Sequence, residues 1–319
     1  MTSVSLRRTL VVAFSGAALL FVGLTLKGQW TSLDQVLAST RSFPWSFDAS
    51  WLALAVGIGV LDLLVMGFIW AFVFRRTGGR AGFPEAIRVW VITNFGRYIP
   101  GKIWQLGGLA AYMKGRGDSS AAALVSALAF QVITVVSGGA VAMATIGVRR
   151  VTGSEGWMPA LVAGGVLLFA GLHPAVIRWI AGRLGSWFGE AEPEVDLAVA
   201  DVVRAAAGML VAWSLYGAGL LFLLRGVGIE VELARLPVLT GIFAASYVVG
   251  YLVLVAPGGL LVREGAMAAL LAEMMGLSIG VAAAVAIMAR LWVVFTELVT
   301  LFVVLSRPGS AGPAKGDSE

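Results

Sequence analysis

Two stretches of this chain place positive charges and helix-breaking residues inside apolar sequence that is long enough to enter a membrane. Each stretch combines a Pro-Gly break with nearby cations: Arg97, Pro100, Gly101 and Lys102 in the first, and Pro257, Gly258, Gly259 and Arg263 in the second. Proline removes a backbone donor and glycine leaves helical dihedral angles easily, so one helix should end at each break and another begin after it. The N-terminus of a helix carries a partial positive charge and free N–H groups, which bind anions such as phosphate.

The cations beside the breaks favour the same chemistry. Arginine can hold a phosphate through two parallel hydrogen bonds, whereas lysine supplies a point charge. Backbone groups without partners are costly in hydrocarbon, so a broken helix survives there only where protein or a polar cavity covers it. We therefore predict that Arg97, Lys102 and Arg263 face one shared cavity deep in the membrane. For Lys102 the plainer interpretation, a side chain that reaches the membrane surface, stays open.

Polar residues close to the breaks are candidates for contacts with a bound anion. Asn94, Tyr98 and Gln105 flank the first break, and Tyr251 precedes the second. Their side chains can donate hydrogen bonds to a ligand, although such residues also join helices to one another inside membrane proteins.

Ionisable residues near the second break and within the predicted spans also need an explanation. Glu264 can form an ion pair with Arg263 or Arg290, or it can carry a proton. Glu297 follows Arg290 by two helical turns, so both should share one face of the last span. Asp62 lies within an apolar run and needs a partner there, either in a structural contact or in a proton relay.

The composition excludes several classes of protein. Hydrophobic residues make up 59% of the chain and charged residues only 13%, which is typical of a membrane protein and not of a soluble domain. The chain has no cysteine and a single histidine, His173, so thiolate chemistry, a histidine metal site and a histidine-based catalytic pair are excluded. No nucleotide-binding loop is present. We expect no enzyme activity, no cofactor, no metal and no nucleic acid partner.

The apolar runs predict an all-α polytopic membrane protein with about six full spans and two broken helical segments. The predicted spans are residues 9–26, 50–74, 119–148, 157–180, 203–224 and 277–305, and the broken segments are 84–113 and 237–276. We expect residues 1–306 to form one transmembrane domain and residues 307–319 a disordered cytosolic tail.

The arms of the first broken segment are short for a membrane span. Each would reach about 20–24 Å, less than the roughly 30 Å of hydrocarbon, which favours a re-entrant hairpin. The first arm of the second segment, 237–256, is long enough to cross completely. Either geometry leaves the following chain on the same side.

The distribution of basic residues indicates the orientation. With both termini in the cytosol, most of the 23 Lys and Arg residues fall on the cytosolic side, as in other membrane proteins. The first broken segment then opens from the cytosol and the second from outside, and each precedes a long span. That arrangement is typical of an inverted repeat whose broken helices meet near the membrane centre.

The two motifs resemble those of the lysylphosphatidylglycerol synthase transmembrane family, the flippase-like membrane domain of multiple peptide resistance proteins. The resemblance rests on N-F-G-R-Y-I-P-G-K-I-W-Q at 94–105, P-G-G-L-L-V-R-E-G at 257–265 and the late Arg290, and it covers nearly the whole chain. The sequence departs from the family's usual P-G-G-L-G-x-R-E at Leu261. We expect no soluble aminoacyl-transferase domain, so the resemblance implies a stand-alone member that does not make lysyl lipid.

The resemblance implies movement of a charged lipid between leaflets of a bacterial plasma membrane. Our leading hypothesis is a flippase whose cationic cavity holds a phosphate-bearing or otherwise anionic head group of a glyco-, polyprenyl- or aminoacyl-lipid. One alternative is an ion-coupled transporter of a small anionic solute. Another is a membrane partner of a lipid-modifying enzyme such as a glycosyltransferase, with no transport of its own.

Overall fold

The computed structural model describes residues 38–98, 103–147, 170–190, 193–252 and 261–306, with a few isolated positions between 159 and 166. Within these ranges every regular element is a helix. Four helices of 27 or 28 residues form the frame: α3 (Ala49–Arg76), α6 (Ser120–Ile146), α10 (Val199–Gly226) and α13 (Ile279–Ser306). Each is long and apolar enough to cross a membrane, and so is the stretch Leu233–Leu252. The prediction of an all-α polytopic membrane protein is confirmed.

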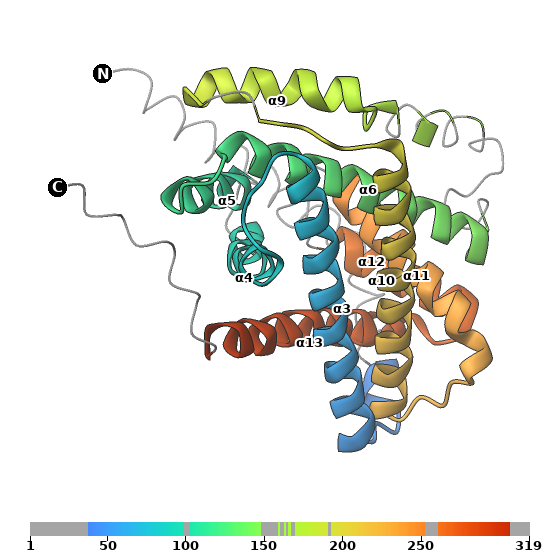
Figure 1. Cartoon of the computed structure of the whole chain (residues 1–319). Helices are drawn as coiled ribbons and strands as arrows, with labels where there is room; N and C mark the ends of the chain where they lie inside the picture. The colour runs from blue at the N-terminus through green and yellow to red at the C-terminus, as the bar shows by residue number, and fades with distance from the viewer. Residues whose placement is uncertain are drawn as a thin grey trace, which may run out of the picture.

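Helices α3 and α10 form an antiparallel pair at the centre of the molecule (Figure 1). At one end the Asp48 amide donates to the Gly226 carbonyl at 3.0 Å, and at the other end Arg76 forms an ion pair with Asp201 at 3.4 Å. Helix α13 crosses this pair, and its Trp292 donates to the Ala55 carbonyl on α3 at 3.0 Å. These contacts tie the long helices together around a buried core.

The two halves of the described chain repeat one order of elements. In the first half α3 is followed by α4 (Phe83–Asn94), a break, α5 (Ile103–Gly115) and α6. In the second half α10 is followed by α11 (Leu236–Leu252), α12 (Val262–Met275) and α13, and residues 253–260 lie outside the described part. Among the described elements, the order of a long helix, two shorter helices and a second long helix therefore occurs twice.

The shorter helices lie largely within the segments 84–113 and 237–276, which the sequence predicts to be broken. Helices α4 and α5, with 12 and 13 residues, reach only about 18–20 Å and are too short to span hydrocarbon individually. A single 3-10 turn, η1 (Phe95–Tyr98), follows α4 directly, and residues 99–102 of the break lie outside the described part. Helix α11 continues from the 3-10 turn η3 (Leu233–Arg235) and is long enough to cross.

The predicted span 157–180 is wrong in its second half. The chain turns at residues 171–173, and a separate helix, α9 (Pro174–Phe188), begins there with His173 as its N-cap. Proline lacks the amide hydrogen that a continuing helix needs, and it disfavours helical angles in the residue before it. The predicted first span, 9–26, and the tail, 307–319, lie outside the described residues.

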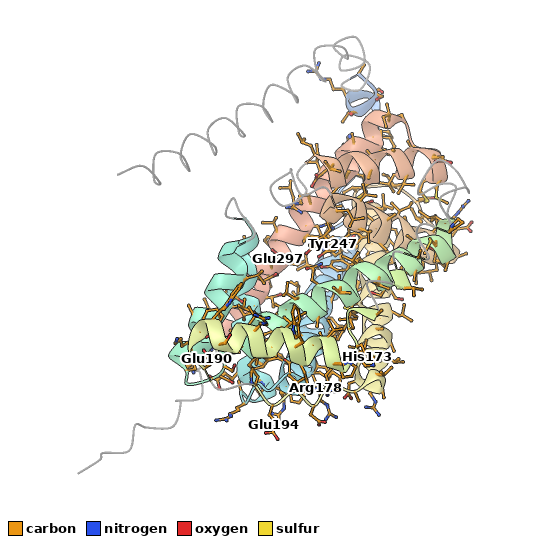
Figure 2. The ribbon with its side chains drawn as sticks, turned by 90° about the horizontal axis from the view of Figure 1, so that it is seen from above. His173, Arg178, Glu190, Glu194, Tyr247 and Glu297 are labelled. Atoms are coloured by element: carbon orange, nitrogen blue, oxygen red, sulfur yellow. The ribbon has the colours of Figure 1, made fainter. Side chains whose placement is uncertain are left out.

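Helix α9 runs alongside α6 at one end of the bundle, with His173 and Glu190 toward its two ends (Figure 2). It packs through Ile177 and Ala181 and leaves Trp179 and Trp187 exposed. Glu190 attaches the end of α9 to the start of α6 by accepting hydrogen bonds from the Ser119 hydroxyl and from the amides of the next two residues. Burial raises the pKa of Glu190, but these hydrogen bonds outweigh burial and hold the pKa below its usual value.

Candidate functional site

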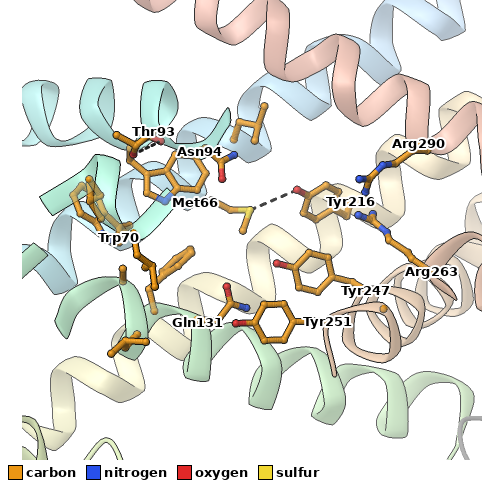
Figure 3. Close-up of a pocket in the computed structure, with 18 residues that line it drawn as sticks. Met66, Trp70, Thr93, Asn94, Gln131, Tyr216, Tyr247, Tyr251, Arg263 and Arg290 are labelled. Atoms are coloured by element: carbon orange, nitrogen blue, oxygen red, sulfur yellow. Dashed lines mark hydrogen bonds between the residues drawn. The ribbon is translucent and has the colours of Figure 1, made fainter. Parts of the chain in front are cut away.

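A cavity of about 190 Å³ lies between the two halves of the bundle, where α3, α4, α5 and α6 face α10, α11, α12 and α13 (Figure 3). Its lining is mostly apolar, with a small number of polar side chains at defined positions. Ligand sites in proteins usually combine these two features. Both predicted broken segments, 84–113 and 237–276, contribute side chains to it.

Two arginines supply positive charge at one end of the cavity. Arg263 extends from the first turn of α12 and Arg290 from the middle of α13, and both point toward Tyr216 in Figure 3. The Arg263 guanidinium lies 4.7 Å from the centre of the Phe243 ring. A cation–π contact of this kind attracts the guanidinium to the ring face and so orients Arg263 beside the cavity.

Gly250 allows α12 to approach α11 closely at this point. A Cβ atom on residue 250 would lie 2.8 Å from the Cβ of Arg263, which is too close for any side chain. The glycine therefore permits the close approach that brings Arg263 to the cavity, and a larger residue would displace the arginine.

Three tyrosines from α10 and α11 form the wall beside the arginines: Tyr216, Tyr247 and Tyr251. The ring of Tyr216 stacks on Phe243 at 4.3 Å between ring centres, and its hydroxyl donates to the Met66 sulfur at 3.6 Å. Thioether sulfur is a weak acceptor, so this hydroxyl can exchange partners at little cost. Phenol groups next to guanidinium groups form a donor-rich surface suited to an anion.

The lining of the cavity also contains buried donors that lack partners. Gln131 Nε2 on α6 and Trp70 Nε1 on α3 are buried without a hydrogen bond, and both residues line the cavity. Nearly all buried donors in proteins are paired, so two such groups at one cavity suggest an acceptor that binds there. Thr93 differs, because its hydroxyl already donates to the Val89 carbonyl at 2.8 Å.

The structure brings together some of the predicted site residues. Asn94, Arg263 and Arg290 line the cavity. Glu264 lies beside it, and its Oε1 is 3.7 Å from Arg290 Nε. The remaining predictions are not tested: Arg97, Tyr98 and Gln105 have described backbone only, and Pro100, Gly101, Lys102, Pro257, Gly258 and Gly259 lie outside the described residues.

Sequence reasoning missed most of the cavity wall. Tyr216, Tyr247, Gln131 and Trp70 lie inside long apolar helices, far from either Pro-Gly break. Their hydrogen-bonding groups inside apolar, membrane-length sequence could have marked them as candidate site residues. The sequence alone does not show that α3, α6, α10 and α11 turn these groups toward a common space.

Leu261, directly before α12, adopts an unusual backbone conformation. Its φ is 68° and its ψ is −36°, and it is the one non-glycine residue with positive φ among the described residues. Side chains with a Cβ rarely adopt such angles, which glycine tolerates. The strained position coincides with the departure from the P-G-G-L-G-x-R-E pattern.

Comparison with known families identifies the chain. The profile described as lysylphosphatidylglycerol synthase TM region matches residues 8–299. The chain belongs to this family. The match covers α3 to α12 and most of α13, and it includes every residue that lines the cavity. No curated protein matches the chain.

Proposed function

We propose that this protein moves an anionic, phosphate-bearing lipid between the two leaflets of a membrane. The head group occupies the cavity between the two halves of the bundle, and the hydrocarbon tails stay in the surrounding bilayer. The family match and the membrane-length helices support a membrane function, and the chemistry of the cavity supports the rest.

The observation that carries the proposal is the charge of the cavity wall. Arg263 and Arg290 reach it from two different helices, and none of the described lining residues is acidic. Guanidinium groups inside a membrane are costly and are usually placed where they serve a function. A phosphate oxygen bound between them would accept charge-assisted hydrogen bonds, with phenol donors beside it.

The size of the cavity supports a head group and not a whole lipid. The cavity volume of about 190 Å³ lies below the roughly 300–1,000 Å³ that is typical of pockets for drug-sized ligands, so it suits a small polar group such as a phosphate. Lipid tails must therefore lie outside.

Leu128 on α6 lines the cavity and keeps 46% of its surface exposed, so α6 forms only a partial wall there. Tails could extend past this side chain into the bilayer.

The proposal is tested by reconstitution in liposomes that carry fluorescent phosphatidylglycerol, with translocation measured by an impermeant quencher. We expect the wild type to exchange the lipid between leaflets, and Arg263→Gln and Arg290→Gln to slow exchange about 10- to 100-fold, since each lost charge-assisted hydrogen bond costs about 1.5–3 kcal/mol. Arg235→Gln, an exposed arginine before α11, is the matched control and should exchange lipid like the wild type.

Equal lipid exchange by the wild type, Arg263→Gln and Arg290→Gln would contradict the proposal. Uptake of a soluble organic phosphate without lipid exchange would instead support the small-solute transporter. Absence of both activities in the correctly folded wild type would favour a non-transporting membrane partner.

A further inference from the structure

We propose that Asp62 is a proton-binding site that couples lipid movement to a proton gradient. This inference rests on the proposed function, since it assigns the energy source of the same site. Asp62 lies in the middle of α3, its side chain is 0% exposed, and neither carboxyl oxygen has a hydrogen-bond partner. The cavity does not include Asp62 itself, but Leu63 and Met66, next to it and one turn on, line the wall.

Among the residues that the structure describes, none supplies a cation paired with Asp62. No ion pair among the described residues includes Asp62. A carboxylate buried in a membrane protein without a cation is strongly unfavourable, and a proton is the smallest cation that can neutralise it. A group of this kind that is also close to a cavity can gain and lose a proton as the cavity changes access.

The titratable groups around the middle of α3 are few. Helix α10 contributes Tyr216, α13 contributes Arg290 and Glu297, and α6 has none. Helix α4 has Glu85 and Arg88 near its start, where Glu85 pairs with Arg116 and Arg88 donates to the Val304 carbonyl. Of these groups Tyr216 is the one whose hydroxyl influences the Asp62 carboxyl.

Tyr216 connects Asp62 to the cavity. Its ring lines the cavity, and its hydroxyl lies near the carboxyl of Asp62, although the geometry falls short of a normal hydrogen bond. A phenol hydroxyl both donates and accepts hydrogen bonds. It can pass its proton to the Asp62 carboxylate while it takes one from water in the cavity, so the phenol is regenerated and one water-borne proton moves onto the carboxylate.

Occupancy of the cavity would affect this proton. A negatively charged head group held by Arg263 and Arg290 disfavours a second negative charge on Asp62. Binding of the lipid therefore favours binding of the proton, and by reciprocity the proton favours the lipid. The two would cross together, and a proton gradient would drive the lipid in one direction.

The test compares the wild type with Asp62→Asn, which keeps the shape of the side chain but cannot exchange a proton. In proteoliposomes with a pH gradient of either polarity, we expect the wild type to exchange lipid several-fold faster under one polarity than under the other. Asp62→Asn should lose this difference, and Asp196→Asn, whose side chain is 85% exposed, should keep it. The inference would be overturned if the wild type exchanged lipid at the same rate under both polarities of the pH gradient, or if Asp62→Asn kept the full difference in rate. Either result would leave the proposed function intact.

A second measurement is independent of lipid transport. In infrared difference spectra of the purified protein between acidic and alkaline pH, Asp62 should add one carboxylic acid component to the bands of the other acidic residues, and Asp62→Asn should lose that component. Identical carboxylic acid bands in the two proteins would overturn the inference even if no lipid is transported. If Asp62→Asn does not fold, Tyr216→Phe replaces it. That variant keeps the ring but removes the relay, so the response to the gradient should fall several-fold, and an unchanged response would contradict the proposed route.

Discussion

Arg290 Nε lies 3.7 Å from Glu264 Oε1, across the contact between α13 and α12. The distance exceeds that of a direct N–H···O hydrogen bond, so the two groups attract each other without a fixed bond. Both side chains are largely buried, with 17% of Arg290 and 15% of Glu264 exposed. Because Arg290 also lines the cavity, its charge is shared between the carboxylate and the space that a ligand would occupy.

This sharing predicts opposite effects for the two partners. Glu264→Gln removes the competing negative charge, so binding of an anionic lipid should tighten. Arg290→Gln removes the cation, so binding should weaken about 10-fold or more, the equivalent of roughly 1.5 kcal/mol. Affinity for phosphatidylglycerol, measured by native mass spectrometry in detergent, checks both changes. Weakened binding in both variants, with Arg235→Gln unaffected, would mean that the pair acts as a structural link only.

Leu128 should control access for lipid tails. It lines the cavity on α6 and is 46% exposed, so Leu128→Trp would add bulk where tails leave the cavity. We expect lipid exchange in liposomes to slow several-fold while the affinity for a short-chain, water-soluble phosphatidylglycerol is unchanged. Val211→Trp, on the exposed face of α10, is the control and should exchange lipid normally. Normal exchange by Leu128→Trp would show that the tails leave elsewhere.

The long spans could be predicted from the sequence because an apolar run of membrane length must pair its backbone groups internally, which a helix does. Helices α3, α6, α10 and α13 begin and end within four residues of the predicted bounds. Residues 157–180 were predicted as one span because they are apolar on both sides of His173, and the sequence favours only a local kink at His173 and Pro174. In the structure a separate helix, α9, begins at Pro174.

The cavity was predicted only in part. Arg263 and Arg290 stand out because full charges are rare in membrane-length sequence. Tyr216 and Gln131 do not, since their contribution depends on which face of α10 and α6 turns inward. With many apolar residues on every face, these helices give no clear amphipathic pattern from which that direction could be derived.

The strain at Leu261 can be relieved by substitution. Leu261→Gly removes the Cβ that makes a φ of 68° unfavourable and should stabilise the fold by about 1 kcal/mol or more. The unfolding temperature in detergent, followed by intrinsic tryptophan fluorescence, should rise. Ala269→Gly introduces the same residue into the interior of α12, where it should destabilise by about 0.5–1 kcal/mol and lower that temperature. A decrease in both variants would show that Leu261 is not strained.

The predicted orientation can be measured directly, because the chain has no cysteine to remove. Helix α9 lies at the end of the bundle where Arg76 pairs with Asp201, which the charge distribution places in the cytosol. A cysteine introduced by Ser186→Cys should react with an impermeant maleimide only after cells are permeabilised. Glu232→Cys, at the opposite end, should react in intact cells. If Ser186→Cys reacted in intact cells and Glu232→Cys reacted only after permeabilisation, the orientation would be opposite to the predicted one.

The central claim is that the cavity holds an anionic lipid head group between Arg263 and Arg290. The most direct measurement is an electron cryo-microscopy structure of the protein in nanodiscs that contain phosphatidylglycerol. We predict head-group density in the cavity, with phosphate oxygens within hydrogen-bonding distance of both guanidinium groups and tails that pass Leu128. A cavity closed by packed side chains, with lipid density confined to the outer surface of the bundle, would contradict it.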